Sequence, residues 1–121
     1  MKKTVLGLVL GGVLGVFDGL SALVSAPEVA PGIVGIVIGS TFKGIIAGLA
    51  IGYFAQKVKS LPLGIVFGLA IGAFLAFLVA MMGDPNTGKH YYWEIMLPGS
   101  LVGIIVGYAT QRYGKPVPAG R

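Results

Sequence analysis

The chain has 121 residues, of which 55% are hydrophobic and only 11% are charged, and its formal net charge is +5 at pH 7. Soluble domains carry about 25% charged residues, so this composition excludes an ordinary soluble domain, a disordered chain and, despite the positive charge, a nucleic-acid-binding protein. The sequence has no cysteine, which excludes disulfide frameworks, thiol catalysis and Cys-based zinc sites. The class that remains is a polytopic membrane protein.

Four stretches are apolar and long enough to cross the hydrocarbon core of a bilayer, which takes about 20 residues of α-helix. They run over residues 4–25, 32–55, 62–82 and 93–111. A membrane-spanning strand would alternate in polarity over about 10 residues, and these stretches do not alternate. The sequence therefore predicts an all-α membrane protein with four transmembrane helices in a single transmembrane domain over residues 1–121.

The first stretch, residues 4–25, carries the aspartate Asp18 near its far end. Asp18 lies on the same helical face as Gly11 and Gly15, because positions three, four or seven residues apart share one side of a helix. The carboxylate is therefore expected to face a neighbouring helix and not the lipid. Ionisable side chains inside the membrane are functional candidates by default, so Asp18 is a candidate transport or binding residue.

The second stretch, residues 32–55, carries Lys43 about 16 Å from its start at 1.5 Å per residue, which is close to the membrane midplane. A cation at that depth costs roughly 2.5–3.5 kcal/mol on insertion scales. Ser40 shares its helical face, and Thr41 lies near it. Because the first two stretches form a hairpin, Asp18 and Lys43 are close enough in depth to meet. They would form either an ion pair that fixes helix register or a polar site that lines a pathway.

The fourth stretch, residues 93–111, contains Pro98, Gly99 and Ser100. Proline has no backbone N–H to donate, so this run predicts a break in the helix. Breaks near mid-membrane are tolerated only where protein or water covers them, and in transporters they often mark binding sites. Pro98 and Ser100 therefore join the candidate binding residues. The alternative is a simple kink packed against a neighbouring helix.

Basic residues predict the orientation, because Lys and Arg concentrate in cytoplasmic loops. One side of the membrane would carry seven of them: Lys2, Lys3, Lys57, Lys59, Arg112, Lys115 and Arg121. The other side would carry Lys89, together with Tyr91, Tyr92 and Trp93 as an aromatic belt at the interface. Both termini are therefore predicted to be cytoplasmic, and the protein is expected in the cell (inner) membrane.

Glycines recur at intervals of about four residues in all four stretches, which places them on one stripe of each helix. Small residues let two helices approach closely in lipid. The predicted packing glycines are Gly7, Gly11, Gly15, Gly19, Gly35, Gly39, Gly44, Gly48, Gly52, Gly64, Gly68, Gly72, Gly99, Gly103 and Gly107. We expect them to form glycine zippers that hold the four helices together, and also to support a homo-oligomer, a dimer or larger.

The two halves of the chain, residues 4–59 and 62–115, resemble each other. A shift of 55 residues places segment 52–57 on segment 107–112, so that Gly, Tyr, Gln and a basic residue coincide. This predicts two tandem helical hairpins that enter the membrane from the same side, a parallel repeat about an axis near the membrane normal. Chance alignment of glycine-rich helices is the alternative.

These features predict a small homo-oligomeric channel or transporter for a small ion or polar solute, embedded in the lipid bilayer. Asp18, Ser40, Thr41 and Lys43 would line the pathway; an unpaired Lys43 would favour an anion, and a titrating Asp18 would favour proton coupling. The alternative is a non-transporting structural or accessory subunit that packs against a partner through its glycine stripes. The sequence has no phosphate-binding loop, HExxH motif or Ser/His/Asp set, so enzymatic activity, a cofactor and a metal are not expected.

Overall fold

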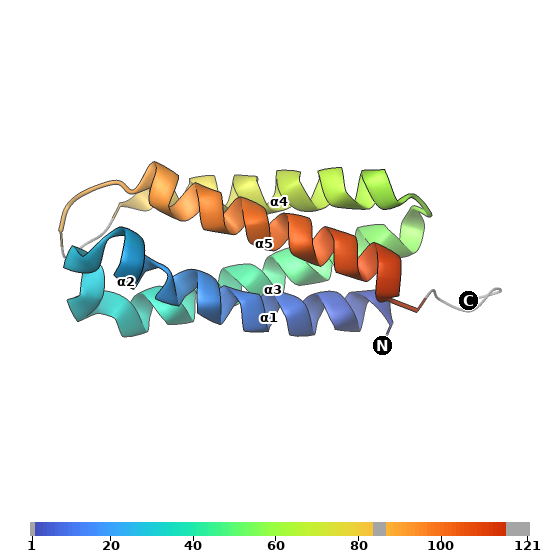
Figure 1. The fold of residues 1–121 in the computed structure, drawn as a ribbon, viewed down its shortest axis with the longest axis horizontal. Coiled ribbons are helices and arrows are strands. Elements are labelled where there is room, and N and C mark those ends of the chain that lie inside the picture. The colour runs from blue at the N-terminus through green and yellow to red at the C-terminus, as the bar shows by residue number, and fades with distance from the viewer. Residues whose placement is uncertain (1, 84–86, 116–121) are drawn as a thin grey trace.

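The computed structural model describes residues 2–83 and 87–115, and within these ranges the regular elements are helical (Figure 1). The elements in chain order are α1 (Lys3–Leu20), α2 (Ala22–Ser25), the 3₁₀ helix η1 (Pro27–Gly32), α3 (Ile33–Lys57), α4 (Leu61–Met82) and α5 (Tyr92–Tyr113). Four helical segments are long and apolar enough to cross a membrane: Lys3–Ser25, Pro27–Lys57, Leu61–Met82 and Tyr92–Tyr113. The prediction of an all-α chain with four such helices is confirmed.

The first predicted span is not one uninterrupted helix, because α1 ends at Leu20. The Ser21 hydroxyl donates to the backbone carbonyl of Asp18, and the Ser21 N–H points to the carbonyls of both Phe17 and Asp18. Serine side chains compete in this way with regular helical hydrogen bonds. The chain leaves the helical conformation at Ala26, and α2 and η1 lie across the end of the first hairpin (Figure 1).

The predicted break at Pro98 is wrong, since α5 continues through it from Tyr92 to Tyr113. Pro98 removes the single hydrogen bond to the carbonyl four residues earlier. The next residue, Gly99, lies so close to α4 that an added Cβ would stand 2.6 Å from the Cβ of Ala76. Close packing against α4 thus supports the helix where that hydrogen bond is missing.

The four long helices form two hairpins, α1 with α3 and α4 with α5, and most helix contacts lie within each hairpin. Figure 1 shows the two hairpins stacked, with α4 and α5 on one side and α1 and α3 on the other. The start of α1 and the end of α5 meet, because the Lys3 N–H donates to the Lys115 carbonyl at 3.3 Å. We call this the terminal end of the bundle. The opposite end, which holds a cavity described below, is called the cavity end.

Glycines bring the backbones together inside each hairpin. A side chain added at Gly11 would collide with the carbonyl of Gly44, and one at Gly48 with the carbonyl of Gly7. In the second hairpin, a side chain added at Gly103 would collide with the carbonyl of Gly68. No side chain larger than hydrogen fits at these positions without moving the two helices apart.

Two of the predicted packing glycines differ from the rest. Within the described part of the chain, a Cβ added at Gly35 or Gly39 would meet nothing within 4 Å. The face of α3 that meets α1 passes through Val37 and Gly44. Residues two positions apart point about 200° apart on a helix, so Gly35 and Gly39 lie on another face. Within the described chain they pack against no other helix, and their predicted role in packing between copies stays a prediction.

The buried core sits between the two hairpins, on the terminal side of the bundle's middle. Ala47, Ile51 and Val106 are at most 4% exposed. Partly buried apolar side chains from α1, α4 and α5 surround them: Leu10, Leu14, Phe67, Ile71, Leu75 and Val102. This apolar cluster fills the interior of the bundle between the cavity end and the terminal end.

Candidate functional site

An ion pair joins the first hairpin near the cavity end. The Nζ atom of Lys43 lies 2.9 Å from Oδ2 of Asp18, and the two side chains are 11% and 6% exposed. Asp18 belongs to the last turn of α1 and Lys43 to the first half of α3. The two charges that were expected to be able to meet are therefore in direct contact.

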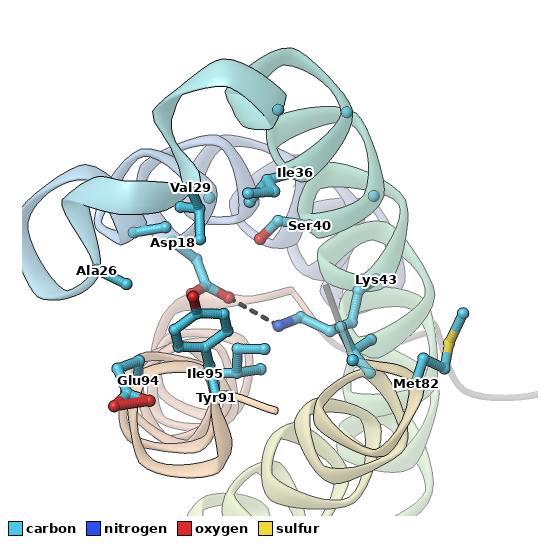
Figure 2. Close-up of a pocket in the computed structure, with 17 residues that line it drawn as sticks. Asp18, Ala26, Val29, Ile36, Ser40, Lys43, Met82, Tyr91, Glu94 and Ile95 are labelled. Atoms are coloured by element: carbon cyan, nitrogen blue, oxygen red, sulfur yellow. Dashed lines mark hydrogen bonds and ion pairs between the residues drawn. The ribbon is translucent and has the colours of Figure 1, made fainter. Parts of the chain in front are cut away.

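A cavity of about 550 Å³ lies next to this pair, and both residues belong to its lining. It is bounded by the end of α1, by α2 and η1, and by the adjoining parts of α3, α4 and α5. Figure 2 shows Asp18, Ser40 and Lys43 directed toward the same space, with Tyr91 opposite Ser40. Ligand sites for small molecules have volumes of about 300–1,000 Å³, so this cavity is large enough to hold one.

The walls of the cavity are mostly apolar or bare backbone. Val29, Ile36, Val79, Met82 and Ile95 supply apolar side chains, and the open glycines Gly35 and Gly39 lie among the lining residues. The space beside these glycines is empty because they carry no side chain. The few polar groups of the cavity therefore stand against an apolar background, an arrangement typical of small-molecule sites.

Ser40 contributes a hydroxyl group to the cavity wall. Its Oγ atom is buried and has no hydrogen-bond partner among the described residues. Buried polar atoms nearly always have a partner from protein or water. The Ser40 hydroxyl is thus a buried polar group beside the cavity that no described residue satisfies.

The other predicted binding residues lie outside the cavity lining. The Thr41 hydroxyl donates to the Val37 carbonyl at 2.7 Å, and its backbone packs on Gly15 of α1. Pro98 and Ser100 do not line the cavity either. The Lys43 ammonium does approach that part of α5, since its Nζ lies 3.6 Å from where a Cβ on Gly99 would stand.

Two polar residues of the cavity were not predicted as site residues. Glu94 lies in the first turn of α5, and Tyr91 directly precedes that helix. The Tyr91 hydroxyl lies 3.3 Å from Oε2 of Glu28 and 3.0 Å from Oγ1 of Thr87, so it connects η1 to the chain before α5. Tyr91 was predicted to belong to the aromatic belt at the membrane interface, and Glu94 follows that belt directly in the sequence.

The terminal end holds a second group of polar side chains, which donate hydrogen bonds to backbone carbonyls. The buried Lys3 ammonium donates to the Ala55 carbonyl at 2.9 Å. The Gln111 side-chain amide donates to the Val58 carbonyl. The last carbonyls of a helix have no partner within it, and a cation there also complements the helix dipole. Lys3 and Gln111 therefore cap α3 and tie it to α1 and α5.

Within residues 2–83 and 87–115, no three His, Asp or Glu side chains gather closely enough to hold a metal ion. Comparisons with protein families, with curated proteins and with solved structures found no match. The fold and the site define a protein with four helices that are long and apolar enough to cross a membrane. At one end it has a cavity lined by a buried ion pair. Its function is therefore argued from that cavity.

Proposed function

We propose that this protein is a small integral membrane transporter for a small ion or polar solute, with the Asp18–Lys43 pair at its binding site. The observation that carries the proposal is a buried ion pair on the floor of a cavity in an otherwise apolar bundle. Intramembrane charges are costly and mark transport pathways by default. A pair used only to fix helix register is a weak source of stability.

The apolar cluster favours a transporter over an open channel. On α3 the cavity lining ends at Lys43, and the cluster begins one helical turn further along, at Ala47. Ile51 and Val106, at 1% and 0% exposure, pack in the interior between the cavity and the terminal end. A site that is accessible from one end and closed toward the other is typical of one state of a protein that works by alternating access.

The excess of basic residues at the terminal end supports an orientation with both termini in the cytoplasm of a cell. The cavity would then open to the outer face of the cell (inner) membrane. We further propose that the two hairpins are tandem repeats with glycine-zipper packing. Support comes from the similar backbone contacts of Gly11 with Gly44 and of Gly68 with Gly103.

The accessory-subunit alternative gains no support from the glycines, because most of the stripe is occupied by contacts within the chain. The homo-oligomer remains a prediction, to be tested by the molecular mass of the purified protein in lipid nanodiscs. Because the cavity lies within one chain, binding at this site does not require a second copy.

The proposal is tested with purified protein in liposomes, by measuring chloride, potassium and proton flux and the transport currents of benzylammonium on a solid-supported membrane. The wild type should transport at least one of these species above the level of protein-free liposomes. Gly39→Leu, which fills the cavity, should abolish that activity. Val34→Leu, at a 71% exposed position of the same helix, is the matched control and should retain it.

Lys43→Met is the second variant of this test, because it removes one charge of the site without filling the cavity. It should change the rate or the selectivity of transport. The same background leak for the wild type, Lys43→Met and Gly39→Leu would contradict the proposal.

A further inference from the structure

We propose that the cavity binds a monovalent organic cation, a small ammonium group on an apolar body, and that the Lys43 ammonium occupies the place of this group while the cavity is empty. The inference rests on the proposed function and adds the chemistry of the ligand. It follows from the charges of the cavity, the nature of its walls and the position of Lys43.

The charges of the lining favour a cation. Among the described residues that line the cavity, Asp18 and Glu94 contribute two carboxylates and Lys43 contributes one ammonium. Lys43 is already paired with Asp18, so its charge is not free to attract an anion. The residues of the lining therefore sum to one excess negative charge, which belongs to Glu94, whose carboxylate points away from the pair (Figure 2). One bound monovalent cation would bring the cavity to neutrality, whereas an anion would increase the imbalance.

The walls favour an organic cation over a bare metal ion. Calcium takes six to eight oxygen ligands, and magnesium requires octahedral oxygen geometry. Residues 2–83 and 87–115 bring no three acidic or histidine side chains together. The remaining walls are apolar side chains and open glycine backbone, with about 550 Å³ between them. An apolar body attached to the cationic group would fill this space and bury apolar surface.

Lys43 shows where the cationic group would bind. Its ammonium reaches from α3 to the Asp18 carboxylate of α1 and lies next to the bare backbone of Gly99 on α5. The Ser40 hydroxyl, one helical turn before Lys43, is a buried acceptor without a partner among the described residues. A ligand ammonium bound at Asp18 has N–H groups to donate both to this carboxylate and to Ser40.

Exchange of one ammonium for another keeps the Asp18 carboxylate paired throughout. The lysine side chain has a flexible four-carbon stem, and the space beside Gly39, one turn away on α3, is open. A ligand can therefore displace Lys43 from Asp18 without opening the bundle. In this arrangement, Lys43 and the ligand compete for the Asp18 carboxylate.

The test uses three probes of nearly equal shape and different charge: benzylammonium, benzyl alcohol and benzoate. Binding to the full chain in phosphatidylcholine nanodiscs is measured at pH 7 by isothermal titration calorimetry. Benzylammonium should bind at least tenfold more tightly than benzyl alcohol, and benzoate should bind most weakly. Preference for benzoate, or equal affinity for the three probes, would overturn the cation assignment.

Variants of the ion pair test the role of Lys43. Lys43→Met removes the competitor and should bind benzylammonium about tenfold more tightly than the wild type. Asp18→Asn/Lys43→Met removes both charges and should lose this gain, and its helical circular dichroism shows whether the fold is kept. An unchanged benzylammonium affinity in Lys43→Met would overturn the idea that Lys43 occupies the ligand's place.

Gly39→Leu separates this inference from the proposed function. If benzyl alcohol or benzoate binds best and Gly39→Leu abolishes that binding, the cavity is a ligand site but the cation assignment fails. If no probe binds the wild type, the inference fails, and the liposome flux assay decides the proposed function independently.

Discussion

Glycine packs helix against helix along much of the bundle, including Gly19 near the cavity end, but at that end it also borders open space. Toward the terminal end, Gly7 faces Gly48 and Gly11 faces Gly44, with so little space that an added Cβ would overlap backbone atoms. Toward the cavity end, Gly39 faces open space. Glycine spacing along a helix therefore does not reveal whether the missing side chain makes room for another helix or leaves open space.

The two ends also differ in the partner that each gives to its buried lysine ammonium. At the terminal end, the Lys3 ammonium binds a backbone carbonyl of α3, so it has a structural partner that no ligand replaces. At the cavity end, the Lys43 ammonium binds a side-chain carboxylate on the floor of a cavity. The first lysine is therefore paired with backbone, and the second is paired with a side chain that borders a cavity.

The largest effect on stability is expected from breaking the ion pair on one side only. Lys43→Met or Asp18→Asn leaves one buried charge without its partner, which costs up to about 3–5 kcal/mol. The double variant Asp18→Asn/Lys43→Met should recover most of this loss, because no charge remains buried. Unfolding of the detergent-solubilised protein by titration with sodium dodecyl sulfate measures all three. A double variant less stable than both single variants would show that the pair stabilises the fold.

An intermediate effect is expected from Gly48→Ala at the closely packed end. The new methyl group would meet the carbonyl of Gly7, and the two backbones would have to separate. Overpacking of this kind costs about 1–3 kcal/mol. The same unfolding titration measures it, and unchanged stability would mean that α1 and α3 do not pack closely at this position.

The smallest effect, and one of opposite sign, is expected from Gly39→Ala at the cavity end. Alanine favours a helix over glycine by up to about 1 kcal/mol, and here its methyl group would meet no neighbour among the described residues. Stability should therefore stay equal or rise slightly in the same titration. A loss as large as that of Gly48→Ala would remove the contrast between the two ends.

Part of the site was predictable from residue type and position alone. Asp18 and Lys43 were identifiable because charges are rare within apolar stretches, and the hairpin brought their depths close. Glu94 and Tyr91 were not, since they lie where polar and aromatic residues commonly meet the membrane interface. Thr41 was expected to line the pathway, but neighbouring positions on a helix point about 100° apart, and its hydroxyl bonds the preceding turn.

The sequence by itself determined the helical architecture and the four membrane-length apolar segments. This follows because backbone polar groups in lipid must be satisfied within the segment, which leaves the helix as the structure for a long apolar run. Only the tertiary structure decided that Pro98 stays within a continuous helix and that Gly39 borders a cavity. These outcomes depend on which neighbour each helix face meets, and that relation between distant segments is not encoded in local spacing.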